Sequence, residues 1–137
     1  MKALIDTNVI LDFLQKRTTS SASVDMIFEL INAKKIKGII AAHTVTNLWY
    51  ILRKFCTKEF RRTLIKTLFD FFEVSSLNKQ KLISAIDRAD FSDFEDCLQD
   101  ECAKEFDADY IVTRNVKDFA NSNVKAVSPE EFIQLAR

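Results

Sequence analysis

The chain has 137 residues, of which 47% are hydrophobic, and its 20 basic side chains balance 20 acidic ones. This length and composition suit one soluble globular domain spanning residues 1–137, and they exclude a disordered or low-complexity protein. One glycine and one proline leave no glycine-rich phosphate loop, and no apolar run reaches the roughly 18 residues that cross a bilayer, so we expect a cytoplasmic protein without membrane contact.

The first predicted element is a buried strand that ends in an acid. Its apolar residues, 3–5, lead into Asp6, and Thr7 and Asn8 then precede an apolar series at helical spacing. The junction between a strand and the next helix lies at the edge where open α/β sheets build their sites. Asp6 is therefore a candidate functional residue, although it could also be only the N-cap of the helix.

Helices and strands alternate along the rest of the chain. Up to residue 75 we predict a helix capped within residues 20–23, a strand at 39–42, a helix opening at His43 with Trp49 and Phe55 on its apolar face, a helix capped by Thr57 and a strand at 72–75. Beyond it we predict a helix with a Leu82–Ile86 apolar stripe, a helix opened by Asp93 and Asp96, a strand at 110–112, an edge strand at 124–127 and a last helix capped by Ser128.

The predicted strands are apolar throughout rather than alternating between apolar and polar residues. Such strands belong to sheets that are covered on both faces, and strands that alternate with helices favour parallel pairing. We therefore predict a three-layer α/β/α fold with a central, mostly parallel sheet.

Polar residues from distant segments should meet at one edge of this sheet. Those expected there are Asp6, Thr7, Asn8, His43, Asn47, Asp93, Asp96, Thr113, Asn115 and Asp118. Clustered carboxylates repel one another unless a multivalent cation or a shared proton relieves them. Oxygen ligands favour Mg²⁺ or Mn²⁺, and the three cysteines and single histidine do not support zinc. Such a site suits attack of a metal-activated water on a phosphodiester.

Several of these residues also have a structural interpretation. Asp93 and Asp96 share a helix face with Asp100, and this face could simply be acidic and solvated. Asp118 could cap a turn. For His43 a local capping or core role is favoured over that of a catalytic base.

Three separated segments resemble motifs of the PIN-domain nucleases, a family that includes the VapC-type ribonuclease toxins of bacterial toxin–antitoxin systems. The segments are DTNVILD (6–12), DFEDCLQ (93–99) and DYIVTRNVKDF (109–119), and the resemblance spans essentially the whole chain. It implies an RNA-cleaving site that binds one or two Mg²⁺ or Mn²⁺ ions. By position, the catalytic, metal-binding acids would be Asp6, Asp96 and Asp118, and the supporting groups would be Thr7, Asn8, Thr113 and Asn115.

Asn47 departs from the family's pattern, which usually has an acid at this place after the second strand. An asparagine offers a carbonyl oxygen but no negative charge, so a cation would bind more weakly unless another acid substitutes. Asp93, one helical turn before Asp96, is the candidate for this fourth metal ligand. The sequence leaves open whether Asp93 replaces the missing acidic ligand or whether the enzyme is weakened.

Basic side chains are concentrated in residues 53–66, which hold six of them and one acid, whereas residues 87–109 hold ten acids. Each segment could be a solvated helix face. A nuclease with an acidic site, however, needs nearby cations to hold phosphates. The candidate RNA-binding residues are Arg53, Lys54, Arg61, Arg62, Lys66 and Arg114.

The leading hypothesis is a metal-dependent endoribonuclease that acts on RNA, with the resemblance adding an antitoxin partner and a homodimer. The alternative, motivated by Asn47, is a catalytically weak or inactive PIN-like module that binds RNA or a protein. A phosphoryl-transfer domain of the haloacid-dehalogenase or receiver kind fits poorly. The former needs a second Asp where this chain has Asn8, and the latter needs an Asp after a middle strand.

Overall fold

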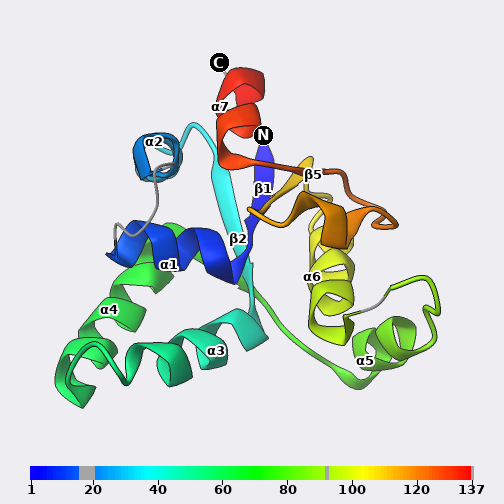
Figure 1. The fold of residues 1–137 in the computed structure, drawn as a ribbon, viewed down its shortest axis with the longest axis horizontal. Coiled ribbons are helices and arrows are strands. Elements are labelled where there is room, and N and C mark those ends of the chain that lie inside the picture. The colour runs from blue at the N-terminus through cyan, green and yellow to red at the C-terminus, as the bar shows by residue number, and fades with distance from the viewer. Residues whose placement is uncertain (16–20, 92, 137) are drawn as a thin grey trace.

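The computed structural model describes residues 1–15, 21–91 and 93–136. Its elements are β1 (Lys2–Ile5), α1 (Thr7–Gln15), α2 (Ser21–Asn32), β2 (Lys37–Ala41), α3 (Ala42–Leu52), α4 (Lys58–Phe71), β3 (Phe72–Ser75), α5 (Lys79–Ile86), α6 (Phe94–Glu105), β4 (Tyr110–Val112), the 3₁₀ helix η1 (Val116–Phe119), β5 (Ala126–Val127) and α7 (Pro129–Ala136) (Figure 1). None of the helices in these ranges has the length and apolar character needed to cross a membrane.

The five strands form one parallel sheet in the order β3-β2-β1-β4-β5. The central strand is β1, in which Leu4 lies between Ile39 of β2 and Ile111 of β4. The chain builds outwards from β1 to β3 and then returns to add β4 on the other side. The direction of strand addition therefore reverses between β1 and β4, which is where open α/β sheets bind their ligands.

The two faces of the sheet are covered by different helices. Ala3 and Ile5 belong to a core shared with α1, α2, α3, α4 and α7, whereas Leu4 and Ile111 belong to a second core closed mainly by α6. Figure 1 shows α1 to α4 gathered on one side of β1 and β2 and α5 and α6 on the other. The predicted three-layer α/β/α fold with a parallel sheet is confirmed.

Two predicted helix caps are confirmed, and Asp93, which was predicted to open a helix, is a third cap. Thr57 Oγ1 accepts a hydrogen bond from Phe60 N at 3.2 Å, and Ser128 Oγ accepts one from Glu131 N at 3.1 Å. Asp93 is the N-cap of α6. The cap expected within residues 20–23 falls partly outside the described residues.

The prediction for α5 is wrong about which face is buried. Leu82 and Ile86, expected in a buried stripe, are 39% and 67% exposed, and Lys81 is buried instead. The Lys81 ammonium group donates to Ser75 Oγ at 3.1 Å and pairs with Glu105 at 2.9 Å. A long lysine stem can cover apolar surface when its charged end has partners, and this reverses the face that hydropathy alone predicts.

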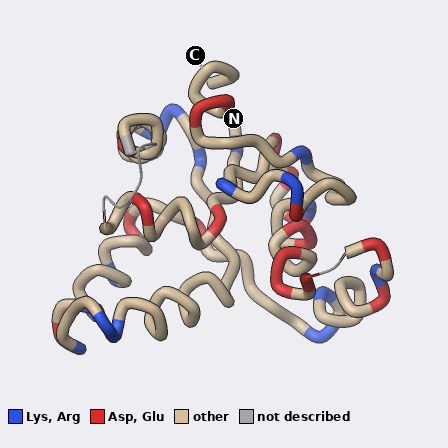
Figure 2. Tube along the Cα trace, viewed as in Figure 1, with Lys and Arg blue, Asp and Glu red and all other residues tan. Residues whose placement is uncertain are grey.

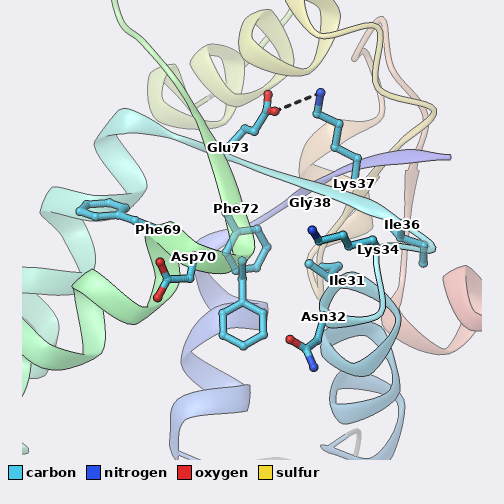
Figure 3. A pocket seen from close by; sticks show the side chains of 11 residues that line it. Ile31, Asn32, Lys34, Ile36, Lys37, Gly38, Phe69, Asp70, Phe72 and Glu73 are labelled. Carbon is cyan, nitrogen blue, oxygen red and sulfur yellow. Dashed lines mark ion pairs between the residues drawn. The ribbon is translucent and has the colours of Figure 1, made fainter.

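A hollow of about 430 Å³ lies at the amino-terminal ends of β2 and β3 (Figure 3). Gly38 forms part of its lining together with Phe72 and Ile31, and an ion pair of 3.1 Å between Lys37 and Glu73 lies beside it. This is the edge of the sheet opposite to the carboxyl ends of the strands. The hollow therefore lies away from the predicted acidic site.

Candidate metal centre

Asp6 lies at the carboxyl end of the central strand and is only 6% exposed. Its backbone N–H donates to Val112 O at 3.0 Å, which joins it to the end of β4. Its carbonyl accepts from Val9 N at 3.0 Å, so α1 starts directly above it. Asp6 thus lies at the reversal point between β1 and β4.

Among the described residues, four donors surround the carboxylate of Asp6. Oδ1 accepts from Thr7 N at 2.7 Å and from Gln99 Nε2 at 2.5 Å. Oδ2 accepts from Thr113 Oγ1 at 2.7 Å and from Asn8 Nδ2 at 3.2 Å. A carboxylate has about four lone-pair positions, so each oxygen accepts two hydrogen bonds in this metal-free structure, and a cation bound at Asp6 would have to take the place of at least one donor. Only one of the four donors belongs to the backbone of α1, and the other three are side chains from α1, α6 and the end of β4.

The polar residues expected to support Asp6 form a connected network. Thr7 Oγ1 donates to Thr44 Oγ1 at 3.1 Å, and Thr113 Oγ1 accepts from Asn115 N at 3.0 Å. Asn8 Oδ1 accepts from the backbone N–H of residue 114 at 3.3 Å. Because each supporting side chain is itself held, the orientation of the Asp6 carboxylate is fixed from several elements.

One pocket of about 310 Å³ brings the predicted acids together. The predicted residues that line it are Asp6, Thr7, Asn8, His43, Asn47, Asp93, Asp96, Asn115 and Asp118. Glu95 and Gln99 also line it and were not expected there. The segments after β1 and β2, the start of α6 and η1 therefore all contribute to the same site.

Asp96 shows that these acids lie close enough to influence one another. Burial raises the pKa of Asp96 to about 7 together with the charges of Asp93, Asp6 and Asp118. A carboxyl group that titrates near neutral pH beside other acids is typical of a functional site. A bound cation would relieve the repulsion that raises this pKa.

The acids nevertheless do not form a closed set of ligands. Over residues 1–15, 21–91 and 93–136, no three His, Cys, Asp or Glu side chains lie close enough together to hold one metal ion. Apart from Thr7 and His43, the polar side chains that line the pocket offer carboxylate and amide oxygens, which is the chemistry that Mg²⁺ and Mn²⁺ prefer. The donor set therefore fits such an ion in kind, and binding would require the carboxylates to move closer together.

The two polar pocket residues on α3 are uncharged or favour the uncharged form. Asn47 lies on the first turns of this helix, where the resemblance led us to expect an acid. His43 Nε2 lies 3.1 Å from the carbonyl oxygen of Glu95. Burial lowers the pKa of His43, against the opposing effects of Glu95 and Asp6. His43 therefore links the start of α3 to the start of α6 as a neutral ring.

Asp100 does not belong to a solvated acidic face, contrary to the structural alternative considered above. It is fully buried, and its carboxylate accepts from Arg88 Nη1 at 2.6 Å. It also accepts from the backbone N–H groups of Asn123 and Val124 at 2.9 and 3.0 Å. Asp100 thus holds the segment before β5, whereas Asp96 on the same helix lines the pocket.

Arg53, Lys54, Arg62 and Lys66, four of the candidate RNA-binding residues, are exposed on the α3–α4 hairpin. Among the described residues, no acid lies within ion-pair distance of them. Figure 2 shows basic residues at this turn and acidic residues concentrated around α6. Phe55, predicted to face the core, is 63% exposed at the same turn.

Arg53 stacks on the Tyr50 ring at 3.7 Å and donates to Tyr50 O at 2.7 Å. Arg61 and Arg114 have partners on other elements. Arg61 stacks over the ring of Trp49 at 4.3 Å and donates to Trp49 O at 3.1 Å. Arg114 Nε lies 2.8 Å from Asp12, a fully buried acid of α1. These contacts attach α4 to α3 and the segment after β4 to α1.

Gln99 is the buried one of the two polar pocket residues, Glu95 and Gln99, that were not predicted from the sequence. A glutamine within a helix rich in acids is expected on the solvated side, yet Gln99 is 3% exposed. The available signal was its position three residues after Asp96, which places both on one helix face.

Comparison with known proteins places this geometry in context. The family profile described as PIN domain matches residues 2–117. No curated protein sequence matches the chain.

Solved structures with the same fold include the following three. VapBC2 from Rickettsia felis, bound to a DNA fragment from its promoter, matches with a TM-score of 0.71 at 18% identity over 93% of this chain and 98% of that one. A toxin–antitoxin complex from Klebsiella pneumoniae matches with a TM-score of 0.70 at 19% identity over 93% and 97%. VapC20 from Mycobacterium tuberculosis, described as a sarcin–ricin loop cleaving toxin, matches with a TM-score of 0.61 at 12% identity over 80% and 86%.

Proposed function

The chain belongs to the PIN-domain family, and from this premise we propose that it is a metal-dependent endoribonuclease that hydrolyses RNA phosphodiester bonds. The observation that carries the proposal is the pocket at the β1–β4 reversal, which Asp6, Asp93, Asp96 and Asp118 line together. The similarity in fold to a toxin described as cleaving the sarcin–ricin loop supports RNA as the substrate.

In this proposal Asp6, Asp96 and Asp118 hold one or two Mg²⁺ or Mn²⁺ ions. Asp93 supplies the negative charge that Asn47 does not. Such an ion would supply Lewis acidity, which would make a water more nucleophilic and would stabilise negative charge on a phosphate. The protein's own contribution is orientation, because the donors around Asp6 fix its carboxylate before a substrate arrives.

Basic side chains of the α3–α4 turn and of α4, together with one after β4, would hold the RNA backbone beside this acidic pocket. We assign this role to Arg53, Lys54, Arg61, Arg62 and Arg114. Arg114 is 38% exposed while paired with Asp12, so part of its guanidinium group stays accessible to a phosphate. Since the protein has no net charge, RNA binding should be modest and sensitive to salt.

We further propose that the chain is the toxin of a toxin–antitoxin pair and acts as one domain in the cytoplasm. The similarity to the Klebsiella pneumoniae toxin–antitoxin complex supports such a partner. An antitoxin that places a basic group against the acidic pocket would neutralise Asp6 and its neighbours. Formation of a homodimer is part of the same proposal.

Cleavage of RNA by the purified protein tests the activity. We expect cleavage with Mn²⁺ that EDTA abolishes and that Asp6→Asn reduces by at least about 100-fold, since the amide keeps the shape but loses the charge that holds the ion. Asp70→Asn, which removes an exposed acid of α4, is the matched control and should leave the rate unchanged. Cleavage by Asp6→Asn at the wild-type rate would contradict the proposal.

A binding module without catalysis is the second candidate. Asn47 and the absence of a closed ligand set within the described residues favour it. Calorimetric titration distinguishes the two: measurable Mn²⁺ binding supports the enzyme, whereas RNA binding without any Mn²⁺ binding supports the module.

A further inference from the structure

We propose that Gln99 is a positioning residue that sets the separation between Asp6 and the acids at the start of α6. The inference rests on the proposed function of the same pocket. It starts from the hydrogen bond of 2.5 Å that Gln99 Nε2 donates to Asp6 Oδ1.

Gln99 is the link between Asp6 and α6. The other three donors to the Asp6 carboxylate are Thr7 and Asn8, which follow it directly, and Thr113, which ends the neighbouring strand. In the described part of the chain, Gln99 supplies the one hydrogen bond that joins Asp6 to α6. Since α6 also carries Asp96 one helical turn earlier, this bond sets how far apart the two acids lie.

The amide of Gln99 is held in the orientation that serves Asp6. Its Oε1 atom is buried and has no hydrogen-bond partner among the described atoms. Turning the amide over would bring Oε1 against Asp6 Oδ1, and two acceptors would then face each other. A buried carbonyl oxygen without a donor is unfavourable, so the orientation is maintained by the bond to Asp6 rather than by the surroundings of Oε1.

A neutral donor is the group that this position requires. When the Asp96 carboxyl group is ionised, its charge repels that of Asp6 and opposes a close approach of α6 to the end of β1. A lysine would oppose that repulsion but cancel charge that a cation needs, and a glutamate would add to the repulsion. The Gln99 amide opposes it while leaving the charge of the pocket unchanged.

Mn²⁺ affinity, measured by electron paramagnetic resonance of the free ion, tests the inference. Gln99→Met removes the donor at nearly the same volume and should weaken Mn²⁺ binding roughly tenfold, the usual effect of losing a residue that orients a ligand. Leu98→Met changes a buried neighbour on the same helix and should bind Mn²⁺ as the wild type does. Wild-type affinity in Gln99→Met, or equal weakening in both variants, would overturn the inference.

A second measurement on the metal-free protein separates this inference from the proposed activity. In ¹⁵N-labelled protein, one side-chain amide proton of Gln99 should resonate at low field and move upfield in Asp6→Asn, with the exposed Gln134 amide unchanged. If the wild-type protein binds no Mn²⁺, the proposed metal site is wrong. The Gln99 amide signal still tests whether Gln99 is held by Asp6. A signal that depends on Asp6 supports the inference, and one indifferent to Asp6→Asn overturns it.

Discussion

The raised pKa of Asp96 predicts that the stability of the folded protein depends on pH. Burial and the neighbouring acids raise its pKa to about 7 from 3.8, so between these pH values the folded protein binds a proton that the unfolded chain does not. The free energy of unfolding should therefore fall as pH rises from about 4 to 7. We expect the melting temperature in EDTA to be lower at pH 7.5 than at pH 5 for this reason.

Substitution of Asp96 tests whether this residue causes the dependence of the melting temperature on pH. Asp96→Asn cannot titrate and should flatten the dependence of melting temperature on pH, while Asp70→Asn should retain it. An unchanged slope in Asp96→Asn would show that the pocket acids do not repel one another as the structure indicates.

Residues at the sheet edge could be predicted from the sequence where they follow strands directly. Asp6 and Thr113 each end a buried strand, and parallel pairing brings such ends together. The partners of Asp12 and Gln99 could not be predicted, because a helix contact depends on how far each helix is rotated and shifted against the sheet. The pairing of Arg114 with Asp12 is of this kind.

Among the elements, β2 depends on its single glycine for close packing (Figure 3). A Cβ atom at Gly38 would lie 2.7 Å from Phe72 Cδ1 and 2.9 Å from Ile31 Cδ1. Both contacts are with buried side chains that have little room to move, so Gly38→Ala should cost about 1–3 kcal/mol of unfolding free energy.

Urea denaturation monitored by circular dichroism measures this cost. The double variant with Phe72→Leu should recover part of the loss, since the smaller side chain makes room for the added methyl group. A Gly38→Ala midpoint equal to that of the wild type would contradict the packing of β2 against β3 and α2.

Helix starts that are marked by a capping residue could be predicted from the sequence. The wrong prediction for the buried face of α5 has a physical cause. Thr57 and Ser128 cap helices because their side chains satisfy N–H groups a few residues away. The buried face of α5 could not be predicted, because it depends on Ser75 and Glu105 receiving the charge of Lys81.

At the scale of the whole molecule, the net charge is zero, but acidic side chains gather around the pocket and basic ones at the α3–α4 hairpin. Helix α3 connects them: its first turns line the pocket, and its end leads into Arg53 and Lys54. Eleven residues of helix span about 16 Å, which a few nucleotides can bridge. A strand of RNA bound at the hairpin can therefore reach the acids.

A triple variant tests this separation of acidic and basic regions: glutamine replaces Arg53, Lys54 and Arg62. The triple variant should weaken RNA binding in EDTA and reduce the slope of log affinity against log salt by about 2, since each lost phosphate contact contributes about 0.7. Mn²⁺ affinity should not change. Glutamine at Lys79, Lys104 and Lys125 removes equal charge elsewhere, and an equal loss of RNA binding there would contradict a specific role for the hairpin.

The central claim is that the acids at the β1–β4 reversal hold a divalent ion. Anomalous diffraction from crystals soaked in Mn²⁺ tests it most directly, because it locates the ion without relying on activity. We predict a manganese peak between Asp6 and Asp96, with Asp118 or Asp93 drawn towards it. A pocket without a peak at saturating Mn²⁺, or a peak only at other carboxylates, would contradict the account.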